Sequence, residues 1–128
     1  MSSNNLNQQI ILECKRKLLT MKQEILNRMR SSSQNFIQSQ SHRETTGDEM
    51  DQSAAQNEEH TFLVSQERMR NHLIEIEMAL ARIETGSYGL CEETEEAIEV
   101  ERLLAIPWTR LSIEGAELRE ALARKFAR

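Results

Sequence analysis

The chain has 128 residues, which suffices for one small domain, or one domain with a projecting arm, and is too short for a large enzyme core. Hydrophobic residues make up 38% and aromatic residues 4%, and with one Pro and four Gly this composition favours an all-α fold. The net charge of −5 argues against a protein that wraps duplex DNA, so we expect a protein partner and no direct sequence-specific DNA binding.

The chain carries no sign of a membrane or secretory protein. No apolar run approaches the roughly 18–20 residues that a membrane-spanning helix needs. The polar start of the chain lacks the basic and apolar regions of a signal peptide. We therefore expect a cytoplasmic protein without a membrane partner, in which Cys14 and Cys91 stay reduced and form no disulfide.

The first predicted element is a long helix that begins near Gln8. Apolar residues at spacings of three and four form a stripe of Ile11, Cys14, Leu18, Met21 and Ile25. No Pro or Gly follows as far as Ile37, so the helix can continue to that residue and beyond.

A second long helix is predicted for residues 51–84. Its heptad-like seam consists of Phe62, Met69, Leu73, Ile76, Leu80 and Ile83. Two such stripes joined by the polar segment 41–47 hide their apolar faces most simply as an antiparallel coiled-coil hairpin. We therefore expect a coiled-coil arm over residues 10–85 with its tip at about 45–53, and a globular head formed by residues 1–9 and 86–128.

Two shorter helices are predicted after the paired glycines Gly86 and Gly89, which suit a tight reversal. The segment Cys91–Glu101 carries six glutamates and no base, and its apolar residues predict a short acidic helix that ends before Pro107. A last helix is expected from about Ser112 to Phe126, with four side chains available for packing: Ile113, Ala116, Leu122 and Phe126.

The acids Asp48 and Asp51 lie where the second helix should begin. They can be ordinary helix caps, which contribute about 0.5–2 kcal/mol, or functional charges that a thin arm delivers into a channel. The three histidines, His42, His60 and His72, have no metal-binding or catalytic spacing and are expected to be solvated. No phosphate loop or catalytic motif is present, so we expect no enzyme activity.

Cys91 is followed at the fourth position by Thr94, whose hydroxyl is a poor zinc ligand. Since two cysteines cannot form a four-thiolate site, no metal is expected. Cys91 can be a small packed residue or a redox-sensing thiol.

The segment Gly86-x-Tyr88-Gly89-x-Cys91, followed by Ile98, Arg102-Leu103, Ala105 and Pro107, resembles the C-terminal module of the DksA/TraR family. In that family two C-x-x-C pairs hold zinc, and the four positions here are Cys91, Thr94, Ser112 and Gly115. With one ligand left, the resemblance implies a degenerate, zinc-free module held by packing through Leu103, Leu104, Trp108, Leu111 and the last helix.

The pair Asp48 and Asp51 also resembles the acidic tip of the family, at a matching distance from Cys91, with Ser53 in place of the usual Ala. The resemblance implies a monomeric regulator that inserts its arm into the secondary channel of RNA polymerase. There it would destabilise promoter open complexes and repress ribosomal RNA promoters. Asp48 and Asp51 would act near the active site, and Arg68 would face the channel rim.

The alarmone ppGpp is the one small molecule that the resemblance implies, at the interface with polymerase. Basic residues are expected where Glu75, Ile106 and Ala116 stand, and an apolar residue where His72 stands. We therefore expect weak synergy with ppGpp. A zinc-free protein of this kind can substitute for a zinc-bearing relative when zinc is scarce.

Three alternatives remain open. A Gre-like cleavage factor also carries acids on a coiled-coil tip, but needs a β-rich C-terminal domain. A redox or metal sensor would depend on Cys91, and a coiled-coil adaptor would make the tip acids dispensable.

Overall fold

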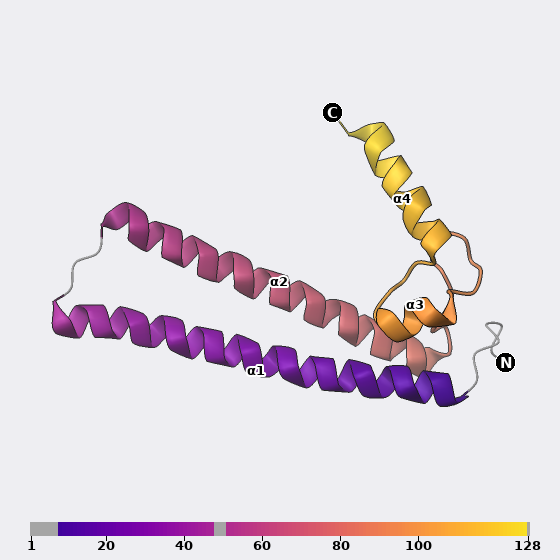
Figure 1. The fold of residues 1–128 in the computed structure, drawn as a ribbon, viewed down its shortest axis with the longest axis horizontal. Coiled ribbons are helices and arrows are strands. Elements are labelled where there is room, and N and C mark those ends of the chain that lie inside the picture. The colour runs from indigo at the N-terminus through magenta and orange to yellow at the C-terminus, as the bar shows by residue number, and fades with distance from the viewer. Residues whose placement is uncertain (1–7, 48–50, 128) are drawn as a thin grey trace. The chain divides into compact units, whose positions relative to one another are not determined.

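The computed structural model describes residues 8–47 and 51–127. Over these ranges the helices are α1 (Gln8–Thr46), α2 (Gln52–Thr85), α3 (Val100–Ala105) and α4 (Ile113–Phe126) (Figure 1). The described residues contain no strand, and their β-structure is limited to one antiparallel bridge between Leu90 and Ala97. The predicted all-α class and the long hairpin of α1 and α2 are confirmed. None of these helices is long and apolar enough to cross a membrane.

Glycines end both long helices. Gly47 has a φ of +74° and donates its N–H to the carbonyl of Arg43 at 3.1 Å. Gly86 has a φ of +85° and donates to the carbonyl of Arg82 at 2.9 Å. Because glycine adopts positive φ without a steric penalty, each one closes its helix and reverses the chain. The serine-rich stretch before residue 34 does not interrupt α1, which explains its length of 39 residues.

The chain forms two compact units, each containing part of α1 and part of α2. The head unit comprises residues 8–21 and 75–127, and the arm unit comprises Lys22–Ile74. The head unit therefore includes about four turns of α1 and about three turns of α2, in addition to the residues after 85 that the sequence assigns to the head. Within each unit the two helices run antiparallel to each other (Figure 1).

The head unit contains most of the buried apolar side chains. They come from both long helices, the loop that follows and α3: Cys14, Leu18, Ile76, Ala79, Tyr88, Cys91, Ile98 and Leu103. The thiol of Cys14 donates to the carbonyl of Leu103 at 3.7 Å, and Lys17 Nζ donates to the carbonyl of Leu104 at 2.9 Å. These bonds satisfy carbonyls at the C-terminal end of α3, which a six-residue helix cannot satisfy itself.

The short acidic helix is shorter than the sequence predicts, because α3 begins only at Val100. The preceding residues form a tight loop, in which Cys91 N–H bonds to the carbonyl of Glu96 at 2.8 Å and Ile98 N–H bonds to that of Gly89 at 2.8 Å. Glu95 has a φ of +61° within this loop. The prediction of a helix from Cys91 onward was wrong, because these backbone groups pair across the loop.

Two other expectations need correction. The side chains of Ile113, Leu122 and Phe126 on α4 are 50%, 47% and 75% exposed, so they do not pack within the chain as predicted. His72 is half-buried on α2, whereas His42 and His60 are exposed as expected.

Candidate functional site

The tip of the arm carries Asp51 immediately before α2. Asp48 lies outside the described residues. Asp51 is exposed, and its Oδ1 accepts the backbone N–H of Ser53 at 2.9 Å while its carbonyl accepts that of Ala55 at 2.9 Å. This is the geometry of a helix N-cap. A carboxylate has two oxygens, so capping fixes the position of the charge without using its full capacity to accept hydrogen bonds.

The other tip and arm residues predicted from the sequence are accessible. Ser53 and Arg68 are both exposed on α2. They lie on the same helix as the Asp51 cap, and Arg68 is 17 residues further along the chain. At about 1.5 Å per residue that separation is about 25 Å.

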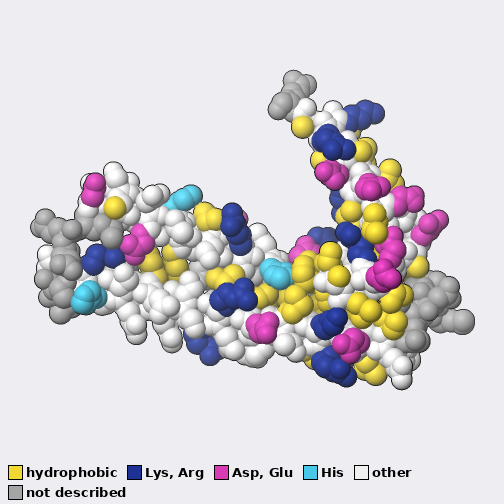
Figure 2. Space-filling model, viewed as in Figure 1, with side chains coloured by type: hydrophobic (Ala, Val, Ile, Leu, Met, Phe, Trp, Pro, Cys, Tyr) yellow, Lys and Arg dark blue, Asp and Glu magenta, His cyan; other side chains and the backbone are white. Residues whose placement is uncertain are grey.

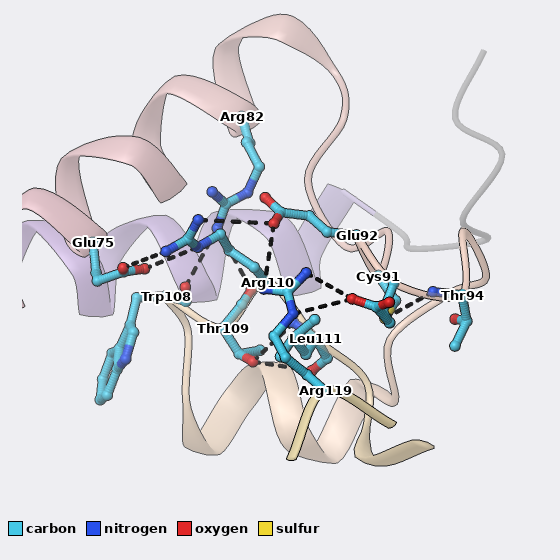
Figure 3. A network of polar contacts seen from close by, with 11 residues as sticks. Glu75, Arg82, Cys91, Glu92, Thr94, Trp108, Thr109, Arg110, Leu111 and Arg119 are labelled. Atoms are coloured by element: carbon cyan, nitrogen blue, oxygen red, sulfur yellow. Dashed lines mark hydrogen bonds and ion pairs between the residues drawn. The ribbon is translucent and has the colours of Figure 1, made fainter. Parts of the chain in front are cut away.

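The four family zinc-ligand positions gather around one sulfur atom in the head unit. Cys91 is 2% exposed, and its Sγ accepts the backbone N–H of Thr94 at 3.4 Å (Figure 3). Ser112 is also buried and accepts the backbone N–H of Gly115 at 3.0 Å, which makes it the N-cap of α4. A Cβ atom on Gly115 would lie only 2.3 Å from Cys91 Sγ. We call this arrangement the Cys91 knuckle: Cys91, Thr94, Ser112 and Gly115.

The donor set of the Cys91 knuckle does not fit a structural zinc ion. Such a site takes four thiolate or imidazole ligands, whereas the knuckle offers one sulfur and two hydroxyls, and Gly115 has no side chain. The Ser112 hydroxyl already accepts a backbone hydrogen bond. Over residues 8–47 and 51–127, no group of three or more His, Cys, Asp or Glu could hold a metal ion.

Two of the four family zinc-ligand positions, Thr94 and Ser112, form hydrogen bonds with Cys91. Burial raises the pKa of the Cys91 thiol, but hydrogen bonds from the side chains and backbone of Ser112 and Thr94 lower that pKa by more, to about 6. The thiolate therefore dominates at neutral pH. Thr94 and Ser112 both donate hydrogen bonds to the sulfur of Cys91. These charge-assisted bonds connect the loop after Cys91 to the start of α4.

An ion-pair network connects α2, the loop directly after Cys91 and α4 (Figure 3). Arg110 binds both carboxylate oxygens of Glu75, at 2.6 and 3.2 Å, and lies 3.7 Å from Glu92. Hydrogen bonding to Glu75 raises the pKa of Arg110. Arg119 on α4 binds Glu93 at 2.8 Å and lies 4.0 Å from Glu92. Networks of this kind stabilise more than isolated surface pairs, each of which contributes about 0–1 kcal/mol.

Arg82 also connects α2 to the segment that carries Arg110. It is half-buried on α2 and donates to the carbonyls of Trp108 and Thr109 at 3.3 and 3.5 Å. Burial lowers the pKa of this guanidinium. Sequence reasoning did not single out Arg82, Arg110 and Arg119. The available signal was the run of glutamates after Cys91, which needs basic partners from elsewhere in the chain.

The resemblance to the family places Glu75, Ile106, Ala116 and His72 near ppGpp. Glu75 is engaged by Arg110 through two hydrogen bonds, and Ile106 and Ala116 are half-buried. His72, which lies in the arm unit, is half-buried as well. None of these four residues supplies the exposed positive charge that a phosphate ligand needs.

Comparisons with known proteins agree with this geometry. Residues 86–121 match the prokaryotic dksA/traR C4-type zinc finger. The RNA polymerase-binding transcription factor DksA of Caulobacter vibrioides is 37% identical over 110 residues, which cover 86% of this chain and 75% of that protein.

Solved structures show the same fold. The transcription factor DksA2 from Pseudomonas aeruginosa aligns with a TM-score of 0.75 and 28% identity, covering 97% of this chain and 93% of that chain. The RNA polymerase binding protein and transcriptional regulator Dks from Chlamydia trachomatis aligns with a TM-score of 0.54 and 22% identity, covering 91% and 93%. The relatives from C. vibrioides and P. aeruginosa are transcription factors, not enzymes. The chain belongs to the DksA/TraR family.

Because the knuckle lacks three of the four ligands, we propose that the head unit folds without zinc. Purified protein should contain far less than one zinc per chain, and its helical circular dichroism should be unchanged by a chelator. Elemental analysis and a chelator titration measure these two quantities. About one zinc per chain, or helix loss on chelation, would refute the proposal.

The low pKa of Cys91 predicts a pH-dependent stability. Its pKa in the folded chain, about 6, lies below the ordinary value of 9.0, so the stabilisation is complete above pH 9 and is lost as the pH falls through 6. The free energy of unfolding should rise between pH 6 and pH 9 by on the order of 2 kcal/mol more in the parent than in Cys91→Ser, whose hydroxyl does not ionise. Denaturant unfolding at the two pH values measures this difference. Equal slopes would show that Cys91 is not held as a thiolate.

Proposed function

We propose that this chain binds RNA polymerase, inserts its arm into the secondary channel and destabilises promoter open complexes, with repression of ribosomal RNA promoters as one result. The observation that carries the proposal is the exposed carboxylate of Asp51, which caps α2 at the tip of a helical hairpin. Membership of the DksA/TraR family supports polymerase as the partner, since the similar proteins from C. vibrioides and C. trachomatis are named for binding it.

The proposed mechanism is electrostatic and requires no catalysis. A charge inside a narrow channel is screened less than one in bulk water, so a carboxylate near the active site acts strongly on a bound metal ion or a basic residue. Asp48 would act beside Asp51. Arg68, which is exposed on α2, would contact the rim of the channel. The chain would act as a monomer, because one hairpin fills one channel.

The Asp51→Asn variant tests the role of the tip. Asparagine keeps the shape and the capping oxygen but removes the charge, so helicity and affinity for polymerase should be nearly unchanged. Inhibition of a ribosomal RNA promoter should fall by about tenfold or more, because the charge is the acting group. Purified transcription and a direct binding assay measure the two effects.

Glu59→Gln is the matched control, since it removes an exposed charge from the same helix two turns from the tip and should inhibit like the parent. If Asp51→Asn also inhibits like the parent, or fails only because it no longer binds or folds, then Asp51 is a helix cap and the proposed mechanism is wrong.

We further propose that ppGpp enhances this activity only weakly. The carboxylate of Glu75 and the apolar side chains of Ile106 and Ala116 offer no positive charge to a phosphate. In a side-by-side transcription assay, adding ppGpp should increase inhibition less than it does for a zinc-bearing relative. Equal enhancement would contradict the proposal.

A further inference from the structure

Few side chains of the arm unit are fully buried. Among the residues that the structure describes there, these are Ile25 and Gln66, at 3% and 8% exposure. Ile37 and Leu63 are 60% and 55% exposed. On the face seen in Figure 2, most side chains of the arm unit are polar and uncharged. Other apolar side chains, such as Met29, Phe36 and Met69, are only half-buried. Hydrophobic burial, which sets the pairing of most coiled coils, therefore fixes these helices less firmly than a fully buried seam would.

Three specific contacts join α1 and α2 in the arm unit. Gln66 Nε2 donates to the carbonyl of Met29 at 3.2 Å and to Ser33 Oγ at 3.3 Å. The rings of Phe36 and Phe62 stack with their centroids 4.2 Å apart and their planes 5° apart.

The third contact lies closest to the tip. The guanidinium of Arg43 binds both carboxylate oxygens of Glu58, at 3.3 and 3.4 Å, and also donates to Ser39 Oγ at 3.0 Å. The two charged side chains are only 23% and 34% exposed. A bidentate pair that is partly shielded from water, with its arginine held by a third group, is stronger than an exposed pair.

The spacing of these contacts makes them specific for one register. Glu58, Phe62 and Gln66 follow each other at intervals of four on α2, so they share one face. Their partners on α1 occur in the reverse order, as an antiparallel pair requires. Sliding one helix by a single turn would separate the ion pair, the ring stack and the amide bonds together.

The arm unit also has a groove on its surface beside these contacts. The groove measures about 500 Å³, is open to solvent, and is lined by Ser32, Phe36, Asn57, Glu58, Thr61 and Phe62. Polar side chains thus lie next to the ring stack and the ion pair. The arm unit therefore depends on a few directional contacts more than a tightly packed hairpin would.

We propose that Arg43 and Glu58 act as positioning residues that lock the arm in one register and thereby fix where Asp51 is presented. Glu58 is seven residues after Asp51 on the same helix, about 10 Å at 1.5 Å per residue. Arg43 lies in the last turn of α1. This inference rests on the proposed function of the tip, but the lock itself is a property of the free chain.

The test compares Arg43→Glu, Glu58→Arg and the double variant that exchanges the two charges. Hydrogen exchange of the backbone amides at residues 32–43 and 54–66 reports opening of the arm without polymerase. Each single variant should exchange about fivefold faster there and lose inhibition in proportion, and the double variant should restore both. Glu59→Arg is the control, because it makes the same charge change at an exposed neighbouring position and should exchange like the parent.

Each outcome decides the proposal. If the single variants exchange like the parent, or if the double variant does not restore protection, the ion pair is not a lock. If exchange accelerates while inhibition stays intact, the pair holds the arm but positions nothing. Failure of the parent chain itself to inhibit transcription would instead refute the proposed function and leave the exchange result standing.

Discussion

The fold of the head depends on how the chain surrounds the sulfur of Cys91. The backbone of Thr94 reaches it from one side, and Ser112 and the first turn of α4 reach it from the other. A metal ion would normally join such segments by four strong bonds. Here the buried sulfur of Cys91 accepts hydrogen bonds from Thr94 and Ser112, which supports the proposal that the head unit folds without zinc. The close approach requires Gly115, since any Cβ atom there would collide with the sulfur.

The ion-pair network also connects the Cys91 knuckle to α2 and α4. Glu92 and Glu93 follow Cys91 directly and bring Arg110 and Arg119 against the loop, while Glu75 connects the loop to α2. Arg110 is already paired with Glu75 and Glu92, so it offers little free charge to an anion. In the arm unit polar contacts also join the helices, since a buried amide and a shielded ion pair lie where few side chains are fully buried.

The long helices were predictable because they depend on the periodicity of apolar residues. The loops and ion pairs were missed because they depend on pairing between residues far apart in the chain. The stripes through Cys14, Leu18 and Ile76 correctly indicated a long hairpin, because helical spacing is a local signal. The acidic run after Cys91 was wrongly predicted to be helical, since its loop is closed by bonds between backbone groups that no side-chain pattern reveals. The apolar residues of α4 were wrongly predicted to pack within the chain. Their apolar character alone does not show whether another part of the chain covers them.

The candidate site was predictable in part. The motif around Cys91 and its distance from Asp48 identified the family, and three of the four family zinc-ligand positions hold residues other than cysteine or histidine: Thr94, Ser112 and Gly115. The partners of Glu75 and Glu58 were not predictable, because Arg110 and Arg43 are 35 and 15 residues away along the chain. Such contacts depend on the three-dimensional arrangement of helices.

The proposed function requires the arm tip to reach the interior of RNA polymerase through the secondary channel. A photoreactive amino acid at Gln52, the first residue of α2 and next to Asp51, can report where the tip lies. If the tip enters the channel, this residue should cross-link to polymerase segments that line it, and the cross-links should disappear when another factor occupies the channel. Cross-links only to the outer surface of polymerase, or cross-links that persist in the presence of the competitor, would contradict it.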